Sequence, residues 1–143
     1  MTETFTLIPS LTMAEVGGLT SDGESLWISA PGAGGQSGSV TKYNPKTKTT
    51  SSFPIADTTR LGELVIAEPI ADGRTRVVWI YDSEKGKFIG LVPDASTATA
   101  TPTLTHPVAA KPGLAWDPFE EALWVHAGSM LRKYIRNYPS QTD

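Results

Sequence analysis

The sequence contains no cysteine among its 143 residues. Disulfide bonds, thiolate nucleophiles and zinc or iron–sulfur centres held by cysteine are therefore excluded. Long apolar runs are also missing, because no stretch approaches the roughly 18 residues of a transmembrane helix. Segment 1–12 lacks the basic start and apolar centre of a signal peptide. We therefore expect a soluble protein made in the cytoplasm, a description that a virion component would also fit.

Basic residues are too few and too dispersed for a nucleic-acid partner. The chain has 12 Lys and Arg against 15 Asp and Glu, which gives a net charge of −3. Phosphate neutralisation needs clustered positive charge, and the densest cluster is Arg132, Lys133 and Arg136. We interpret this cluster as a solvated strand edge that its charge protects from aggregation. We expect neither a nucleic acid nor a membrane as partner.

The sequence also lacks amphipathic helical stretches of about 10–15 residues. Such stretches alternate with strands in parallel α/β folds. The chain contains instead three segments that carry the same signals in the same order. Each reads as a strand that starts near a glycine, then a turn, then a second strand with a central tryptophan. The first strands start near Gly18, Gly62 and Gly113, the turns contain Asp22-Gly23, Asp72-Gly73 and Asp117-Pro118, and the tryptophans are Trp27, Trp79 and Trp124.

Third strands follow at 39–43, 87–91 and 129–134, and Thr-rich fourth strands follow at 49–55 and 97–104. Trp27 and Trp79 are 52 residues apart, and Trp79 and Trp124 are 45 apart. Repeats of roughly 40–50 residues with four short strands are typical of β-propeller blades. The repeat therefore predicts a blade-like sheet in each third of the chain.

The series Gly-Leu, Asp-Gly, Leu-Trp-Ile and Val-Thr-Lys-Tyr-Asn-Pro-Lys-Thr, found between Gly18 and Thr47, resembles the blades of NHL, SMP-30 and streptogramin-lyase-like β-propellers. The resemblance extends over residues 14–136. It implies an all-β fold of about three four-stranded antiparallel blades in a single domain, 1–143. The blades are expected at about 14–58, 59–107 and 108–138, and a β-sandwich is the structural alternative.

The third copy ends without a fourth strand, whereas the N-terminus has a spare one at 3–10. We expect this strand, with Phe5 and Leu7, to complete the last blade beside Leu131 and Tyr134, in its own chain or in a partner. Three blades are fewer than a propeller needs, and an open arc exposes sheet edges and apolar faces. A homodimer with a six-bladed ring is the favoured arrangement. A nine-bladed trimer and docking onto a different propeller protein are the alternatives.

The resemblance places a ligand or partner on the face formed by the loops between second and third strands and between consecutive blades. The inner-strand pairs Leu19-Thr20, Leu64-Val65 and Leu114-Ala115 lack the acidic and amide side chains that hold a divalent cation in SMP-30-type enzymes. We therefore predict no metal, no cofactor and no catalytic residue, and we interpret the isolated histidines as surface or structural. The side chains predicted for this face are Glu15, Arg60, Asp82, Lys85, His106, Trp116 and His126.

These observations favour a non-catalytic structural or binding module that assembles as a homo-oligomeric β-propeller. A phage tail or capsid component is the predicted setting, because such proteins are often small symmetric oligomers. A carbohydrate-binding lectin is one alternative. A propeller lyase or hydrolase with its site on the loop face is the other.

Overall fold

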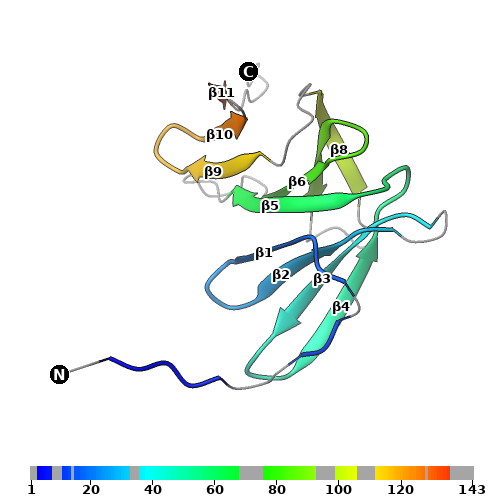
Figure 1. Cartoon of the computed structure of the whole chain (residues 1–143), viewed down its shortest axis with the longest axis vertical. Coiled ribbons are helices and arrows are strands. Elements are labelled where there is room, and N and C mark those ends of the chain that lie inside the picture. Colours follow the sequence, from blue (N-terminus) through cyan, green and yellow to red (C-terminus); the bar gives the residue numbers. More distant parts are fainter. Residues whose placement is uncertain are drawn as a thin grey trace, which may run out of the picture.

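The computed structural model describes residues 3–7, 11–13, 15–32, 36–67, 76–92, 99–105, 112–127 and 129–135. Within these ranges the chain forms eleven β-strands and no helix, so no described helix could cross a membrane. The strands make three antiparallel sheets in which each strand pairs with its neighbour in sequence (Figure 1). The prediction of an all-β chain with three repeated antiparallel sheets is confirmed.

The sheets follow the order of the repeats. Sheet 1 consists of β1 (Gly18–Ser21), β2 (Leu26–Ala30), β3 (Ser39–Asn44) and β4 (Thr49–Pro54). Sheet 2 consists of β5 (Leu61–Ala67), β6 (Val77–Asp82), β7 (Lys87–Val92) and β8 (Thr99–Thr105). Sheet 3 has three strands, β9 (Gly113–Asp117), β10 (Ala122–Ala127) and β11 (Met130–Ile135).

The first strands of the three sheets lie side by side. Strand β1 contacts β5, and β5 contacts β9, so sheet 2 lies between the other two. The sheets diverge from these first strands, and the outer strands β4 and β8 lie apart, at the bottom and the top of Figure 1. The chain therefore builds an open stack with sheet 1 at one end and sheet 3 at the other.

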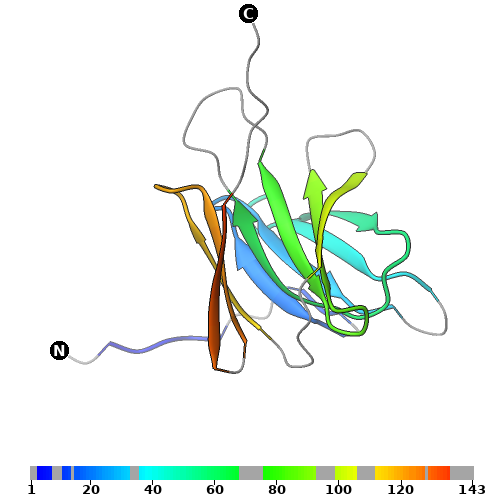
Figure 2. The same cartoon turned by 90° about the horizontal axis from the view of Figure 1, so that it is seen from above.

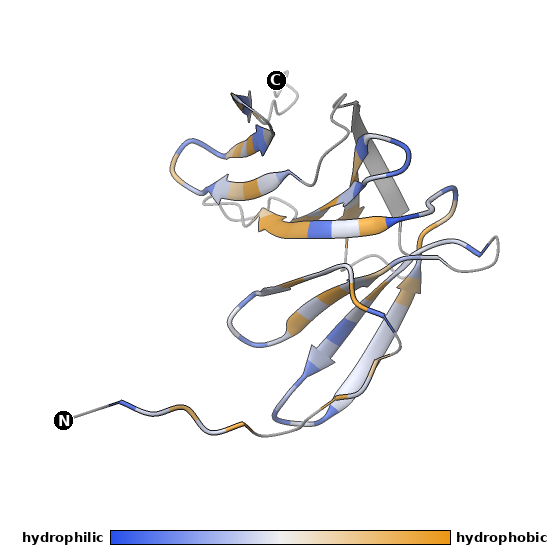
Figure 3. Cartoon of the chain, viewed as in Figure 1, coloured by the Kyte–Doolittle hydropathy of each residue, from blue (hydrophilic) through white to orange (hydrophobic). Residues whose placement is uncertain are grey.

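Two apolar cores hold this stack together. The first lies between sheets 1 and 2 and contains Trp27 and Val40 from one side and Leu64, Val78 and Ile80 from the other. In Figure 3, apolar stretches colour β2 and β5, the strands that meet at this core. The second core lies between sheets 2 and 3. Its members are Ala67, Val77, Trp79, Tyr81, Phe88, Leu123 and Val125, with Val65, Leu114, Trp116 and Tyr134 at its margin.

Strand β6 supplies residues to both cores and is buried along its whole length. Its sequence, Val-Val-Trp-Ile-Tyr-Asp, is apolar at successive positions because alternate side chains meet sheets on opposite faces. Trp79 points to sheet 3, whereas Val78 and Ile80 point to sheet 1. The continuous apolar run is therefore the signature of a sheet that is covered on both sides.

The strand registers place the three repeated tryptophans at equivalent positions. Trp27 pairs with Thr20 on β1, Trp79 with Val65 on β5, and Trp124 with Ala115 on β9. We call the side of each sheet that carries this residue its Trp face. The Trp face of sheet 1 packs on sheet 2, and that of sheet 2 packs on sheet 3. Within the described chain no sheet covers the Trp face of sheet 3, where Trp124 is half-buried.

The predicted N-terminal strand is not formed within the chain. Residues 3–7 adopt no regular structure, and Phe5 and Leu7 are 98% and 89% exposed. This segment extends away from the sheets in both views, while β11 lies at the other end of the stack (Figures 1 and 2). Completion of the last sheet by the chain's own N-terminus is therefore not observed in residues 3–7. Residues 8–10 lie outside the described ranges, and completion by a partner stays a prediction.

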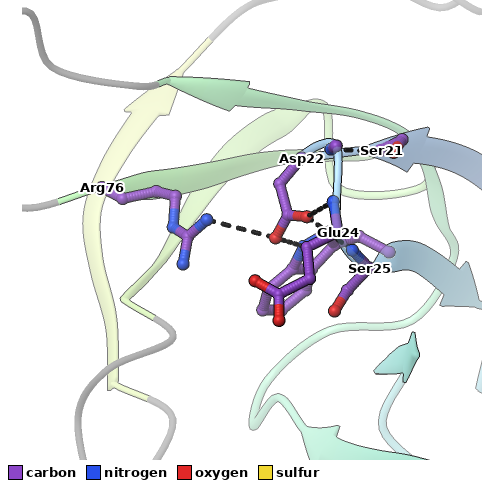
Figure 4. Close-up of polar contacts among 7 residues, drawn as sticks. Ser21, Asp22, Glu24, Ser25 and Arg76 are labelled. Atoms are coloured by element: carbon purple, nitrogen blue, oxygen red, sulfur yellow. Dashed lines mark hydrogen bonds and ion pairs between the residues drawn. The ribbon is translucent and has the colours of Figure 1, made fainter. Parts of the chain in front are cut away.

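The tight β1–β2 turn carries a polar link between sheets 1 and 2. The Asp22 carboxylate accepts hydrogen bonds from the backbone N–H groups of Glu24 and Ser25, at 2.9 and 2.6 Å. It also accepts the indole N–H of Trp27 at 2.9 Å and forms an ion pair with Arg76 at 3.1 Å (Figure 4). Arg76 lies just before β6, so a single carboxylate closes the turn, orients the core tryptophan and joins two sheets.

The Asp22 side chain is only 4% exposed. Burial raises its pKa, but the backbone N–H of Ser25, the Trp27 indole, the backbone N–H of Glu24 and the Arg76 guanidinium together outweigh burial and lower the pKa to about 2. Because the folded pKa lies below the ordinary value of 3.8, the ionised carboxylate stabilises the folded state at neutral pH.

We predict that stability falls as the pH drops from about 4 through about 2, because protonation of Asp22 then favours unfolding. The substitution Asp22→Asn should lower the free energy of unfolding at pH 7 by about 2 kcal/mol and flatten this acid-dependent loss. Denaturant titrations at several pH values measure both effects. Asp57→Asn, at an exposed position of positive φ, is the matched control and should change stability by less than about 0.5 kcal/mol. An unchanged pH profile in Asp22→Asn would contradict the assignment.

Candidate functional site

A cavity of about 790 Å³ opens where the first strands of sheets 1 and 2 begin. It lies between the segment before β1, the end of β2, the start of β5 and the turn after β6, with one residue from the segment before β9. Its walls are formed by Glu15, Val16, Gly17, Pro31, Arg60, Leu61, Gly62, Glu63, Tyr81, Ser83, Glu84 and Pro112. The cavity is therefore built by the loops before first strands and after second strands, the loops on which the sequence analysis expects a ligand.

Close approach of β1 to β5 shapes the floor of this cavity. A methyl group on Gly17 would lie 2.1 Å from the carbonyl oxygen of Leu61, and one on Gly18 would lie 2.6 Å from that of Gly62. The buried Ser29 hydroxyl donates to the same Gly62 carbonyl at 2.5 Å. Only glycine allows the two backbones to come this close, which brings Glu15 and Val16 to the same cavity as Arg60 and Glu63.

Asp82 anchors the two loops on the sheet 2 side of the cavity. Its buried carboxylate accepts the backbone N–H of Thr59 at 2.9 Å, those of Glu84 and Lys85 at 3.1 Å, and that of Arg60 at 3.4 Å. One carboxylate thus ties the connection between sheets 1 and 2 to the β6–β7 turn. These bonds hold Arg60 and Glu84 at the cavity wall.

The environment of Asp82 explains its ionisation. Burial raises the pKa of the carboxyl, but hydrogen bonds from the backbone N–H groups of Thr59, Lys85, Arg60 and Glu84 prevail and lower it. The neighbouring Tyr81 hydroxyl has a raised pKa because it is buried and lies near the Asp82 charge. Asp82 therefore stays a carboxylate at neutral pH and acts as a structural acceptor behind the cavity, while Tyr81 stays protonated.

The structure brings two of the predicted loop-face residues, Glu15 and Arg60, into the cavity wall. Lys85 is exposed nearby, and its ammonium group donates to the Asp57 carbonyl. Trp116 and His126 lie elsewhere, in sheet 3. Trp116 packs at the margin of the core between sheets 2 and 3, and His126 is exposed on the Trp face of sheet 3. His106 lies outside the described residues.

Sequence reasoning missed Glu63, which also lines the cavity. The pairing of β5 with β6 shifts register between Leu61 and Leu64, so a bulge interrupts the alternation on which a face assignment relies. A signal was present, because the second repeat reads Gly62-Glu63-Leu64 where the others read Gly18-Leu19 and Gly113-Leu114. The inserted residue is the one that the bulge turns to the cavity.

The charges on the cavity wall are three carboxylates, Glu15, Glu63 and Glu84, and one guanidinium, Arg60. Such a wall presents mostly hydrogen-bond acceptors, which suit hydroxyl-rich or cationic groups. Over the described ranges, no group of three or more His, Asp or Glu side chains is arranged to hold a metal ion.

Comparison with known proteins identifies no relative: no family model, no curated protein and no solved structure matches the chain.

We predict that Asp82→Asn lowers the free energy of unfolding by about 2 kcal/mol or more, because an amide NH₂ cannot accept the backbone N–H groups that the carboxylate accepts. Urea unfolding measures the loss. Glu84→Gln changes an exposed carboxylate at the same turn and should cost less than about 0.5 kcal/mol. Equal effects of the two substitutions would show that Asp82 does not anchor the loops.

Proposed function

We propose that this chain is a non-catalytic structural and binding module that assembles with a second copy of itself into a closed ring of six sheets, a β-propeller. The observation that carries the proposal is the unequal burial of three equivalent tryptophans. Trp27 is 0% exposed and Trp79 is 7% exposed, each covered by the following sheet, whereas Trp124 is only half-buried and has no following sheet among the described residues.

The Trp face of sheet 3 presents an apolar surface that no described sheet covers. Leu131 is 63% exposed on this face, and Trp124 and His126 lie beside it. At the corresponding place in sheet 1, Val40 is fully buried against sheet 2. The Trp face is therefore buried by a following sheet in sheets 1 and 2, and no described sheet buries it in sheet 3.

The far side of sheet 1 offers the complementary surface. Sheet 2 receives Trp27 on Leu64, Val78 and Ile80, and the registers place Leu19, Leu26 and Ile28 of sheet 1 at the same positions. Leu19 is 60% exposed and Ile28 is 5% exposed on this side, which no described sheet covers. We call it the receiving face of sheet 1. Sheet 3 of one copy fits there as sheet 2 fits on sheet 1.

A second copy is the economical occupant of both faces. The Trp face and the receiving face lie at opposite ends of the stack, so one molecule cannot pair them by itself without closing three sheets into a ring. β-propellers have at least about four blades. Two copies joined head to tail use the same contact twice and leave no open face.

The proposed ring would place the cavity where a ligand could bind. The cavity lies at the starts of the first strands, which in a propeller surround the central channel. Two symmetric cavities would then face one axis with their carboxylates and arginines. The virion setting and carbohydrate binding stay predictions. If the protein binds a glycan, we expect the glycan in the paired cavities.

We predict that the purified chain has twice the mass of a single chain at micromolar concentration, measured by native mass spectrometry or light scattering. Trp124→Ser and Leu19→Ser, on the Trp face of sheet 3 and the receiving face of sheet 1, should each raise the dimer dissociation constant at least about tenfold, because they remove apolar contact area from the same interface. Phe119→Ser changes an 89% exposed side chain in the β9–β10 turn and should leave the dimer intact. A wild-type monomer at these concentrations would overturn the proposed ring.

The charges at the proposed junction give a second, sharper prediction. Inside the chain Asp22 pairs with Arg76 across sheets 1 and 2, and the residues at the equivalent positions of the junction are Asp117 and Glu24. Glu24→Arg should therefore strengthen the dimer severalfold by recreating this ion pair, and salt should weaken the gain.

Glu24→Gln, which only removes the like charge, is the matched control. It should give a smaller gain in dimer affinity, and salt should change that gain less. Dissociation constants measured by analytical ultracentrifugation at low and high salt compare the variants. A weaker dimer in Glu24→Arg would exclude the proposed alignment of sheets.

A further inference from the structure

The fourth strand of sheet 1 completes the cover of its tryptophan. Phe53 on β4 stacks on Trp27, with ring centroids 6.3 Å apart and an interplanar angle of 21°. The Lys42 ammonium lies 5.2 Å from the centre of the same indole. In the register, Phe53 pairs with Val40, and Ser51 pairs with Lys42. A lysine, an aliphatic residue and a phenylalanine on the two outer strands thus surround the indole.

Sheet 3 repeats this arrangement in its three described strands. Lys133 pairs with Trp124, and its ammonium group lies 5.3 Å from the indole centre, as Lys42 does at Trp27. Leu131 pairs with His126 at the place where Val40 pairs with Ser29. Among the described residues sheet 3 has no strand that would supply the counterpart of Phe53, and β11 is the edge of this sheet.

The N-terminal segment carries an aromatic residue that suits this position. In an extended strand Phe5 and Leu7 lie on one face, and both are almost fully exposed in the single chain. Pairing Phe5 with Leu131 sets Phe5 at the position of Phe53. The same antiparallel register sets Glu3 opposite Lys133, so that the charges are complementary. Shifting the strand by two residues would set Leu7 opposite Leu131 and leave Glu3 opposite the apolar Ile135.

Resting on the proposed ring, we infer that residues 3–7 of the second copy add to β11 as an antiparallel strand, with Phe5 opposite Leu131 and stacked on Trp124. The second copy is the source because its sheet 1 occupies the Trp face of sheet 3 in the ring. The segment that precedes β1 then starts beside the neighbour's β11. This pairing removes an exposed strand edge and gives Phe5, Leu131 and Trp124 an apolar cover.

The absence of cysteine makes the register directly testable, because any disulfide must join introduced residues. Thr4 lies opposite Arg132 in the inferred register, whereas Thr6 lies opposite Arg132 in the register shifted by two residues. Two double variants, Thr4→Cys/Arg132→Cys and Thr6→Cys/Arg132→Cys, therefore compare the two registers. Thr4 and Thr6 lie on the same face of the strand. We expect the first to form a covalent dimer on mild oxidation and the second to remain unlinked.

The mass of each variant before oxidation tests the ring separately from the strand register. A monomer before oxidation would overturn the ring itself. A dimer in which the Thr6 pair links and the Thr4 pair does not, or in which neither links, would overturn the register and leave the ring standing. A disulfide within one chain would show that the strand comes from its own molecule.

A double-mutant cycle tests the stacking contact independently of disulfide geometry. Phe5→Ala should raise the dimer dissociation constant at least about tenfold, while Thr6→Ala, on the other face of the strand, should raise it less than about threefold. In the Trp124→Ala background Phe5→Ala should lose most of its effect, because its partner is gone. An equal effect in both backgrounds would overturn the contact between Phe5 and Trp124.

Discussion

Packing of one sheet's tryptophan face onto the next sheet is the interaction on which the rest of the structure depends. A blade-like sheet has two faces, and a strand such as β6 is buried on both because it has a neighbour on each side. Trp27 and Trp79 fill the two inter-sheet cores. Each end sheet keeps one face that no described sheet covers, and the residues of that face occupy the same positions as those that are buried inside the stack. The proposed assembly follows from this repetition.

Two buried carboxylates supplement the apolar packing where strands end. Asp22 satisfies two backbone N–H groups of its turn while it binds the indole of Trp27 and the guanidinium of Arg76. Asp82 accepts four backbone N–H groups from two loops that are more than 20 residues apart in sequence. Backbone groups that turn away from a sheet need acceptors when they are buried. The cavity is the space that these anchored loops leave between them.

Much of this architecture could be predicted from periodic signals. The three strand–turn–strand units, the tryptophans at equivalent positions and the third strands follow from alternation and from turn residues such as Gly23, which has a positive φ of 91°. The loop face was predictable because first and second strands are antiparallel, so the loops before one and after the other share an edge. Glu15 and Arg60 meet there. Glu63 was not predicted at the cavity because a bulge breaks the alternation of side chains at that point.

Sequence alone determined the strands, their antiparallel order and which residues of each strand share a face, because these properties depend on neighbours close in the chain. Only the tertiary structure decided which faces are covered. It turned Asp82 inward as an anchor, set Trp116 against sheet 2, and left Trp124 half-buried and residues 3–7 exposed. The physical reason is that burial depends on contacts between segments far apart in sequence, and alternation cannot distinguish a face that has a neighbour from an identical face that lacks one.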